Sequence, residues 1–269
     1  MADATRAHVW GNSEAYEAYM GRWSRPVAGV ALAWLGLPPG LSWLDVGCGT
    51  GAVTEVILDA ADPREILGVD PSADFLATAA GQIADPRVHF AVGDARALPV
   101  PDEAYDAVVA GLVLHFVPDP PPAVSEMVRA VRRGGTVAAY VWDFAGERQF
   151  TRYFWQVATA LDPAAADYDP GRVCSLCHPE PLAALFAGAD LQAVTVQAVA
   201  VPIVFRDFDD YWQPLLLGGS SPAQRYTASQ GEGQQSALRE RLHATLPIAD
   251  DGSIPLLGRL WAVRGTKDA

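Results

Sequence analysis

The stretch WLDVGCGTGAV, residues 43–53, predicts the opening unit of an α/β domain. An apolar run of strand type, Trp43 to Val46, leads into a turn that has glycine at positions 47, 49 and 51, and an apolar helical pattern follows. A strand, a tight turn and a helix in this order begin the nucleotide-binding α/β domains. Several nucleotide cofactors bind to such a turn, so the turn alone does not identify its ligand.

Strand-like and helix-like patterns continue to alternate as far as Trp142. This alternation predicts a parallel sheet with helices on both faces. We expect Gly134-Gly135 to end the last helix of the region as a C-cap. The predicted strands are 42–47, 65–70, 88–94, 105–114 and 135–142, and the predicted helices are 51–60, 72–84 and 121–132.

The second half of the chain is less regular, and no linker divides it into independent domains. We interpret residues 162–178 as a loop and GGSSPAQ, residues 218–224, as a break. The predicted helices of this half are 147–161, 179–189, 208–217 and 234–246, and its predicted strands are 191–205 and 256–265.

The composition limits the partners that we expect. The 269 residues carry a formal net charge of −13, and a negative field of this size disfavours nucleic acid. The sequence contains no uninterrupted apolar run of about 18 residues, which is the signal of a membrane-spanning helix. The N-terminus contains acidic residues and no apolar signal region, so we expect a cytoplasmic protein. Abundant Ala and Pro, with Arg in place of almost all Lys, suggest a GC-rich bacterial genome.

The three cysteines are too few for a disulfide framework. Cys174 and Cys177 stand in CSLCH, which has the spacing of a c-type haem attachment site, but such attachment normally accompanies export. A zinc site would need a fourth ligand beside Cys174, Cys177 and His178. We therefore expect no metal and no haem, and interpret this stretch as a loop that packs under a lid.

Aspartates end three successive predicted strands, at Asp45, Asp70 and Asp94. In an open α/β sheet the ligand lies at these carboxyl ends. A carboxylate at Asp45 would repel the pyrophosphate of a dinucleotide and favour the ammonium and sulfonium groups of S-adenosylmethionine. Asp70 suits the ribose hydroxyls, and Asp94 with the amide of Ala95 suits the adenine edge. The alternatives are local, since Asp45 could cap the turn and Asp70 the following helix.

Five stretches together resemble the successive motifs of a class I S-adenosylmethionine-dependent methyltransferase. The similarity is to the small-molecule branch that includes the ubiquinone and menaquinone methyltransferases, and it covers about residues 41–143. The stretches are LDVGCGTG (44–51), GVDPS (68–72), GDARALP (93–99), YDAVVAGLVLHFVPD (105–119) and VRRGGTVAAYVWD (131–143).

The resemblance implies a Rossmann-like α/β fold, with a seven-stranded, mostly parallel sheet in the order 3-2-1-4-5-7-6 and strand 7 antiparallel. Helices cover both faces, and a helical cap is added. We expect one domain over 1–269, in which 1–40 supply cofactor-covering helices, 41–143 the cofactor-binding core, 144–250 include the cap insertions, and 251–269 the last strand.

The resemblance also assigns the cofactor site. The glycine turn approaches the methionine part, Asp70 the ribose, and Asp94 with Ala95 the adenine. In the N-terminal stretch 14–26, Tyr16 and Arg22 are candidates, and Arg22 is suited to the methionine carboxylate. The alternative is that Arg22 and Trp23 only anchor their helix. The expected cofactor-binding residues are Tyr16, Arg22, Asp45, Gly47, Cys48, Gly49, Gly51, Asp70, Pro71, Asp94, Ala95 and Gly111.

The acceptor site is less defined. His115 follows the fourth strand and is the candidate general base, if the acceptor must first lose a proton; the alternative is that it shapes the pocket. Aromatic residues of the second half could line an apolar pocket, or simply pack the cap on the core. We interpret Asp207, Asp209 and Asp210 as a solvated face or a helix start. The candidate substrate-binding residues are Trp142, Asp143, Tyr153, Trp155, Tyr211 and Trp212.

The predicted reaction is transfer of a methyl group from S-adenosylmethionine to a small-molecule acceptor by in-line displacement, leaving S-adenosylhomocysteine. The acceptor atom stays open between oxygen, nitrogen, sulfur and carbon, and the protein is expected to be a monomer or homodimer. Three alternatives remain: a S-adenosylmethionine-binding enzyme of other chemistry such as cyclisation, a cofactor-binding module without catalysis, and a nicotinamide oxidoreductase.

Overall fold

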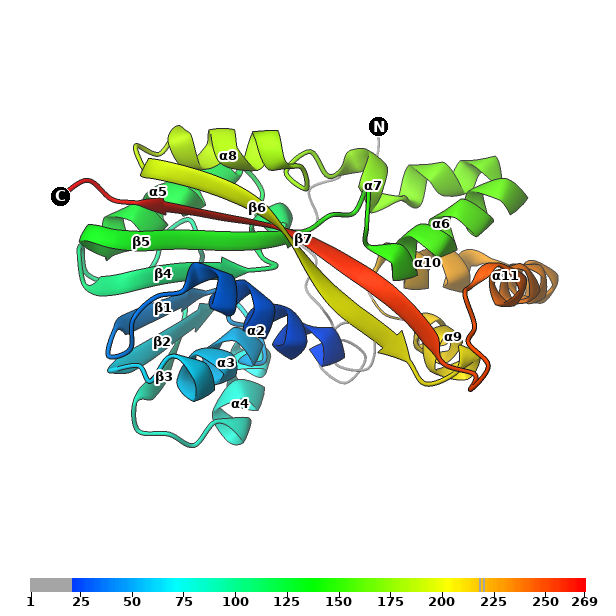
Figure 1. Ribbon diagram of the computed structural model, residues 1–269, viewed down its shortest axis with the longest axis horizontal. Helices are drawn as coiled ribbons and strands as arrows, with labels where there is room; N and C mark the ends of the chain where they lie inside the picture. Colours follow the sequence, from blue (N-terminus) through cyan, green and yellow to red (C-terminus); the bar gives the residue numbers. More distant parts are fainter. Residues whose placement is uncertain (1–20, 218, 220) are drawn as a thin grey trace.

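Seven strands form one sheet in the computed structural model, which describes residues 21–217, 219 and 221–269 (Figure 1). Their order is β3-β2-β1-β4-β5-β7-β6, and β7 runs antiparallel to both of its neighbours while the other pairs are parallel. The predicted fold class is therefore confirmed. The strands are β1 (Ser42–Val46), β2 (Glu65–Asp70), β3 (Val88–Val92), β4 (Tyr105–Gly111), β5 (Val131–Trp142), β6 (Gln192–Phe205) and β7 (Ile254–Thr266).

Helices cover both faces of the sheet because its central strands are apolar along their length. All five residues of β1 are buried, which is typical of a parallel strand between two helix layers. In Figure 1, α2 and α3 lie in front of the sheet and α5 lies behind it, beside α8. The helices of these layers are α2 (Arg22–Leu35), α3 (Ala52–Ala60), α4 (Ala73–Gln82), α5 (Pro120–Ala130) and α8 (Pro179–Ala187).

The strands β6 and β7 extend beyond the rest of the sheet as a two-stranded arm. β5 pairs with β7 only as far as Trp142 with Leu260, whereas β6 and β7 stay paired as far as Phe205 with Ile254. Figure 1 shows this arm reaching α9, beyond the carboxyl ends of the parallel strands. The cap lies on that side and consists of α6 (Gln149–Leu161), η3 (Pro163–Tyr168), α7 (Pro170–Val173), α9 (Phe208–Leu216), α10 (Pro222–Ser229) and α11 (Glu232–Thr245).

The predicted C-cap at Gly134-Gly135 was wrong. α5 ends at Ala130 and β5 begins at once, so both glycines lie within a strand. Gly134 has a φ of +68°, and the register of the β4–β5 pair shifts beside it, between Tyr105 and Ala107. An irregularity within strand β5, and not the end of a helix, therefore accounts for the glycine at position 134.

The predicted break at 218–224 and the predicted loop at 162–178 are both partly helical. α10 begins at Pro222, where Ser221 and Gln224 form a reciprocal capping box. The sequence Ser-Pro-Ala-Gln carries that signal, since a capping box needs Ser at the N-cap and Gln three residues later. The loop contains η3 and α7. No helix in the described part of the chain is long and apolar enough to cross a membrane.

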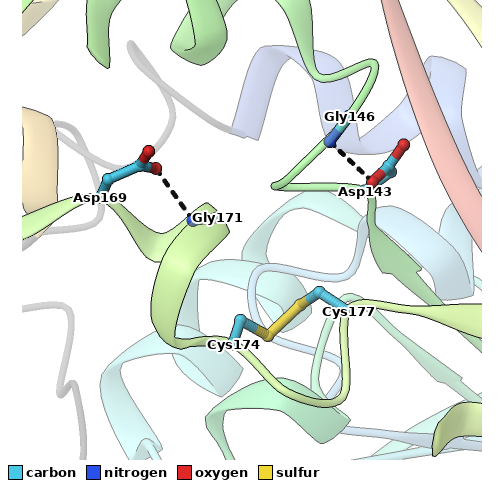
Figure 2. The surroundings of a disulfide bond; sticks show 6 residues. All are labelled: Asp143, Gly146, Asp169, Gly171, Cys174 and Cys177. Carbon is cyan, nitrogen blue, oxygen red and sulfur yellow. Dashed lines mark hydrogen bonds between the residues drawn. A yellow bond between two sulfur atoms is a disulfide. The ribbon is translucent and has the colours of Figure 1, made fainter. Parts of the chain in front are cut away.

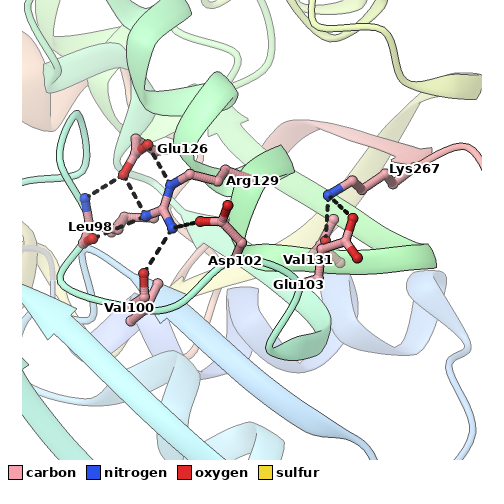
Figure 3. A network of polar contacts seen from close by, with 8 residues as sticks. All are labelled: Leu98, Val100, Asp102, Glu103, Glu126, Arg129, Val131 and Lys267. Atoms are coloured by element: carbon pink, nitrogen blue, oxygen red, sulfur yellow. Dashed lines mark hydrogen bonds and ion pairs between the residues drawn. The ribbon is translucent and has the colours of Figure 1, made fainter.

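Arg129 in α5 holds the loop between β3 and β4, which carries Asp94 (Figure 3). Its guanidinium donates to the carbonyl oxygens of Leu98 (3.1 Å) and Val100 (2.8 Å) and pairs with Glu126. Glu126 in turn accepts a hydrogen bond of 2.8 Å from the amide of Leu98. These contacts fix the loop to α5 behind the sheet. They therefore order the segment that follows Asp94.

Candidate active site

The glycine turn between β1 and α3 requires glycine at all three predicted positions. Gly47, Gly49 and Gly51 have φ values of +72°, +55° and +92°, a region that disfavours residues with a Cβ atom. A Cβ atom on Gly47 would collide with the side chain of Val113, and one on Gly51 would lie 2.8 Å from Cδ1 of Ile83. At Gly49 no described heavy atom lies within 4 Å of that position, so the middle of the turn is open to a ligand.

Asp45 lies beneath this turn and is completely buried. Its Oδ2 accepts a hydrogen bond of 2.7 Å from the hydroxyl of Thr54, while its Oδ1 has no partner among the described residues. Burial raises the pKa of Asp45 to about 7, and the nearby charge of Asp70 acts in the same direction. A buried carboxylate oxygen without a partner costs free energy unless a cationic or donor group satisfies it.

Asp70 organises the turn from the end of β2. Its Oδ2 accepts from the amide of Gly49 (3.0 Å) and its Oδ1 from the amide of Ser72 (2.8 Å). Burial raises its pKa, against the effect of these two hydrogen bonds. The N-cap of α4 is Ser72, whose hydroxyl accepts from the amide of Phe75, so the alternative reading of Asp70 as the helix cap was wrong.

Cys48 and Pro71, which are also predicted to bind the cofactor, differ in their exposure to solvent. Cys48 is buried, with its sulfur against Gly68 of β2, and burial raises the pKa of its thiol. Pro71 is exposed. Neither side chain offers a charge to a ligand, and their contact with the cofactor stays a prediction.

Asp94 is exposed, and its carboxylate is bound by its own neighbour. Arg96 donates from Nε to Oδ1 (3.0 Å) and from a terminal nitrogen to Oδ2 (2.6 Å), and these bonds lower the pKa of Asp94. Ala95 lies beside it, half-buried against the core. Asp94 therefore stays ionised and has to share its oxygens with Arg96 if it also binds an adenine amino group.

The end of β4 is crowded and strained. A Cβ atom on Gly111 would collide with the hydroxyl of Tyr140 and lie 2.7 Å from Cγ2 of Val53. The next residue, Leu112, has a φ of +60°, which is unusual for a residue that is not glycine and occurs often at functional sites. Leu112 is held there by a hydrogen bond of 2.8 Å from its amide to the carbonyl oxygen of Tyr140.

His115 lies in η2 (Leu114–Phe116), directly after this strained position. Although the residue as a whole is half-buried, both ring nitrogens are buried and have no hydrogen-bond partner among the described residues. The ring lies 4.0 Å from the ring of Phe116 and 5.4 Å from that of Phe144, centroid to centroid. Burial, with the positive charge of Arg148, lowers the pKa of His115 to about 3, so the imidazole is neutral at physiological pH.

Asp143, predicted to contact substrate, is occupied by structural contacts. Its carboxylate accepts from the amide of Gly146 at 2.9 Å (Figure 2). It also accepts from the amide of Glu147 at 2.9 Å and forms an ion pair of 2.6 Å with Arg259 of β7. These bonds fix the turn after β5 to the two-stranded arm. A role for Asp143 in binding the acceptor stays a prediction, with both of its oxygens already engaged.

Trp142 forms one wall of an aromatic enclosure around Arg148, which the sequence did not single out. The guanidinium carbon of Arg148 lies 5.0 Å from the ring of Trp142, 4.6 Å from Phe144 and 4.5 Å from Phe150. Arg148 is only 5% exposed. The buried cation stacks on three rings and lies close enough to His115 to disfavour protonation of that imidazole.

The other predicted acceptor residues pack the cap on the core. Tyr211 donates a hydrogen bond of 2.7 Å to the carbonyl oxygen of Phe150, and Trp212 stacks on Phe208. Trp155 is buried, whereas Tyr153 is half-buried. For Tyr211 and Trp212 the structure thus supports the packing alternative, while Trp155 also lines an open groove of the cap.

Arg22 has a partner that the sequence did not predict. It forms two hydrogen bonds with Asp210 of α9, and this pair lowers the pKa of Asp210 to about 2. Asp207, Asp209 and Asp210 do form the start of α9, as one of the two interpretations had it, with Asp207 as its N-cap. Asp210 does not belong to a solvated face, since its side chain is 9% exposed. Contact of Arg22 with a cofactor stays a prediction, and Tyr16 lies outside the described residues.

Cys174 and Cys177 form a disulfide bond between α7 and α8 (Figure 2). The argument that three cysteines are too few for a framework missed this single local bond, for which the C-x-x-C spacing was the available signal. Cys48 is the free cysteine. Among the described residues no group of three or more His, Cys, Asp or Glu side chains lies close enough to hold a metal ion.

Comparison with known proteins places the chain among methyltransferases. The family described as "Methyltransferase domain" matches residues 44–139, which include all three glycines and Asp45, Asp70 and Asp94. The demethylmenaquinone methyltransferase of Roseiflexus castenholzii is 34% identical over 170 residues, covering 59% of this chain and 71% of the relative. The 2-phytyl-1,4-naphtoquinone methyltransferase of Thermosynechococcus vestitus is 34% identical over 152 residues, covering 52% and 66%.

A solved structure extends the likeness of fold beyond these alignments. Phosphoethanolamine N-methyltransferase 2 of Haemonchus contortus, in complex with S-adenosyl-L-methionine, superimposes with a TM-score of 0.58. The match covers 95% of this chain and 56% of the other at 18% identity. The structural match therefore extends over more of the chain than the sequence alignments, which cover 59% and 52% of it.

Proposed function

Because this chain belongs to the class I S-adenosylmethionine-dependent methyltransferases, which transfer methyl groups to small molecules, we propose that its glycine turn and three strand-end aspartates hold the methyl donor. The donor would lie across the carboxyl ends of β3, β2, β1 and β4. Asp45 and the turn would face its methionine part, Asp70 its ribose, and Asp94 with Ala95 its adenine. The acceptor would meet the methyl group beside β4 and β5, below the cap.

The observation that carries this proposal is that Oδ1 of Asp45 has no partner among the described residues and lies under an open glycine turn. S-adenosylmethionine brings an ammonium and a sulfonium group, and either cation lowers the cost of a buried carboxylate. A pyrophosphate would place further negative charge beside Asp45 and Asp70, whose pKa values burial has already raised. The residues therefore fit the methyl donor better than a dinucleotide.

When bound, S-adenosylmethionine supplies a methyl carbon that its sulfonium already activates. The chain then has to align the acceptor and exclude water, and alignment alone contributes on the order of 7–11 kcal/mol in favourable cases. Gly111 and Leu112 fix the backbone beside the reacting atoms. His115, neutral and with a pKa of about 3, is a weak base in this structure, which supports its role in shaping the pocket.

The proposal treats residues 1–269 as one methyltransferase domain. The shared hydrophobic core supports this, since it joins the helices of the cap to the sheet within the described residues. A cytoplasmic location and a monomeric or dimeric state stay predictions from the sequence.

Calorimetry with S-adenosylhomocysteine tests the site through Asp70→Asn. The amide keeps one acceptor oxygen, so either Gly49 or Ser72 loses its partner, and we expect the Kd to rise about 10-fold or more. Asp85→Asn is the matched control. Asp85 also accepts the amide of the residue two positions later, Arg87. It precedes β3, whereas the turn follows β1, so the two lie at opposite ends of the parallel strands.

Mass spectrometry of the products separates the remaining alternatives. A methyltransferase forms S-adenosylhomocysteine together with a product that is heavier by one methyl group. A cyclase leaves the mass of its substrate unchanged, and a binding module shows affinity for the cofactor without turnover over a broad acceptor panel. Equal Kd values for Asp70→Asn and Asp85→Asn would contradict the proposed cofactor site.

A further inference from the structure

The disulfide bond joins the cap to the helix layer behind the sheet (Figure 2). Cys174 directly follows α7, and Cys177 lies two residues before α8 begins at Pro179. α7 belongs to the cap, whereas α8 packs on β6, β7 and α5, with Leu182 and Phe186 fully buried. The bond therefore connects a short segment of the cap to a firmly packed helix of the core.

The two sulfurs of this bond differ in their access to solvent. Cys177 is 1% exposed, whereas Cys174 is half-buried and follows Val173, which is 70% exposed. Thiol–disulfide exchange begins when a thiolate attacks one sulfur of the bond, so access decides which sulfur reacts. An external thiol can therefore approach Cys174, while the protein shields Cys177.

The bond closes a loop that contributes little to the stability of the fold. Only Ser175 and Leu176 lie between the two cysteines. In the chain-entropy model the stabilisation by a disulfide bond grows with the length of the loop that it closes. Each neighbouring helix also has support of its own, since Asp169 caps α7 through the amide of Gly171 (2.9 Å) and α8 has a buried face. Opening the bond should therefore leave the fold intact.

α7 lies against the chain where it leaves β5. Gly171 packs so closely there that a Cβ atom would lie 2.7 Å from the carbonyl oxygen of Phe144 and 3.1 Å from Cα of Ala145. The ring of Phe144 packs in turn on the ring of His115, with 5.4 Å between the centroids. Direct contacts therefore run from α7 to the segments that follow β5 and β4.

α7 is attached mainly at its two ends. None of its four residues is buried. At its start, Asp169 pairs with Arg152 of α6 at 2.7 Å, and at its end Cys174 is bonded to Cys177. Arg152 and Arg172 line the same open groove of the cap. Without the bond α7 is held at its start alone, so it can move away from the exit of β5.

We propose that Cys174 and Cys177 form a reversible dithiol–disulfide site, and that the closed bond holds α7 against the chain that leaves β5. The reaction partners are a dithiol reductant for opening and a disulfide oxidant for closing. The sequence predicts a cytoplasmic location, where disulfide bonds are usually redox-sensing or catalytic and not permanent. This inference goes beyond the proposed function, because it does not depend on the methyl donor.

Opening of the bond by a dithiol takes two steps. A thiolate of the reductant attacks Sγ of Cys174, the bond between the two cysteines breaks, and Cys177 leaves as a thiolate. The second thiolate of the reductant then attacks the reductant's own sulfur in this mixed disulfide and releases Cys174. Two electrons pass to the protein, the reductant ends as a disulfide, and its two thiol protons end on the two cysteines.

The first test measures whether the bond opens in the folded chain. The full chain is equilibrated with mixtures of oxidised and reduced dithiothreitol, alkylated and mapped by mass spectrometry. We expect Cys174 and Cys177 to become alkylated together as the mixture becomes more reducing, and the bond to form again when the oxidised reagent is restored. A bond that opens only after the chain has been unfolded would overturn the proposal.

Two variants test the order of attack. In Cys177→Ser only Cys174 of this pair can form a mixed disulfide with oxidised glutathione, and in Cys174→Ser only Cys177 can. We expect the reaction at Cys174 to be about 10-fold faster or more, because access to the sulfur limits exchange. Equal rates at the two sites, located by peptide mapping, would overturn the assigned order.

Hydrogen exchange tests the hold on α7. We expect reduction to speed exchange about five-fold or more in residues 143–148 and 170–176, and to leave β1–β4 unchanged. Cys174→Ser should exchange like the reduced chain under both conditions, and the control Ser175→Ala, which keeps both cysteines, should follow the unmodified chain. Equal exchange in the oxidised and reduced chains would overturn the hold on α7. Faster exchange throughout the sheet would show a purely structural bond, and would also overturn it.

Discussion

Arg22 in α2 and Asp210 in α9 join the core to the cap through an ion pair with two hydrogen bonds. Nη1 lies 2.9 Å from Oδ1 and Nη2 lies 2.8 Å from Oδ2, across 188 positions of sequence. The pair also touches the two-stranded arm, since the guanidinium of Arg22 lies 5.3 Å from the ring of Phe205. Segments that are distant in the sequence therefore join the core, the arm and the cap.

Loss of this ion pair should lower the stability of the folded protein more than loss of a neighbouring exposed ion pair. We expect Arg22→Ala or Asp210→Asn to lower the free energy of unfolding by about 1–3 kcal/mol, because the remaining partner is largely buried. Asp209→Asn is the control, since the Asp209–Arg239 pair is exposed and such pairs contribute about 0–1 kcal/mol. Thermal denaturation measures both, and calorimetry with S-adenosylhomocysteine runs in parallel. An unchanged melting temperature with a raised Kd for Arg22→Ala would instead assign Arg22 to the cofactor.

Cofactor binding should depend on pH through Asp45. Its pKa of about 7 lies above the ordinary aspartate value, so ionisation favours a bound cation and the affinity should rise from pH 5.5 to 8. Calorimetry in two buffers of different ionisation enthalpy should detect proton release near pH 6.5. Asp45→Asn should abolish this release. A wild-type affinity that does not change with pH would refute the role of the carboxylate.

The same raised pKa has a consequence for stability. The folded chain holds the Asp45 proton more tightly than the unfolded chain does. The stabilisation is therefore fully present below about pH 4 and is lost as pH rises through about 7. Denaturation of the cofactor-free protein should show this slope, and Asp45→Asn should remove it.

His115 should not control the rate between pH 5 and 8. With a pKa of about 3 it stays neutral over this range, and we expect a flat log kcat profile once methyl transfer is shown to be rate-limiting. Since the folded pKa is depressed, the stability linked to His115 is present above about pH 6.5 and is lost as pH falls toward 3. A break near pH 6.5 that disappears in His115→Gln would instead identify a general base.

Thiol titration should find one free cysteine per unfolded chain before reduction and three after it. The Cys174–Cys177 bond accounts for two sulfurs, and Cys48 is the buried free thiol. The chain must be prepared without reductant and denatured in the presence of the thiol reagent. Cys48→Ala should leave no thiol before reduction. Three thiols in the unreduced protein would show that the bond does not form in solution.

Local pattern was sufficient to predict the glycine turn and the acids at the strand ends. Gly47, Gly49 and Gly51 all adopt positive φ values, and Asp45, Asp70 and Asp94 stand within two residues of the ends of neighbouring strands. These features depend on contacts between residues close in sequence and on the regular geometry of parallel strands. The error at Gly134 has the same origin, because a glycine after a helical pattern signals a helix end as strongly as it signals a strand irregularity.

Local pattern carried little information on the contacts that the cap makes. Nothing in the neighbourhood of Arg152 or Arg172 marks them as walls of one groove, since they belong to separate helices brought together by Asp169. Tyr211 and Trp212 were equally good candidates by composition, yet their side chains are used in packing. The signals that were present, the C-x-x-C spacing and the Ser-Pro-Ala-Gln capping box, concern backbone and covalent structure rather than recognition.

The sequence by itself determined the order of elements, the glycine turn and the identity of the acids at the strand ends, because these follow from side-chain periodicity and backbone sterics. Only the tertiary structure decided which charges are paired and which are free. It engaged Arg22 with Asp210 and left Arg172 facing a groove. It also buried Oδ1 of Asp45 and both ring nitrogens of His115 without partners in the part of the chain that the structure describes. The physical reason is that burial and long-range pairing set the energy of a charge, and neither is a property of neighbouring residues in the chain.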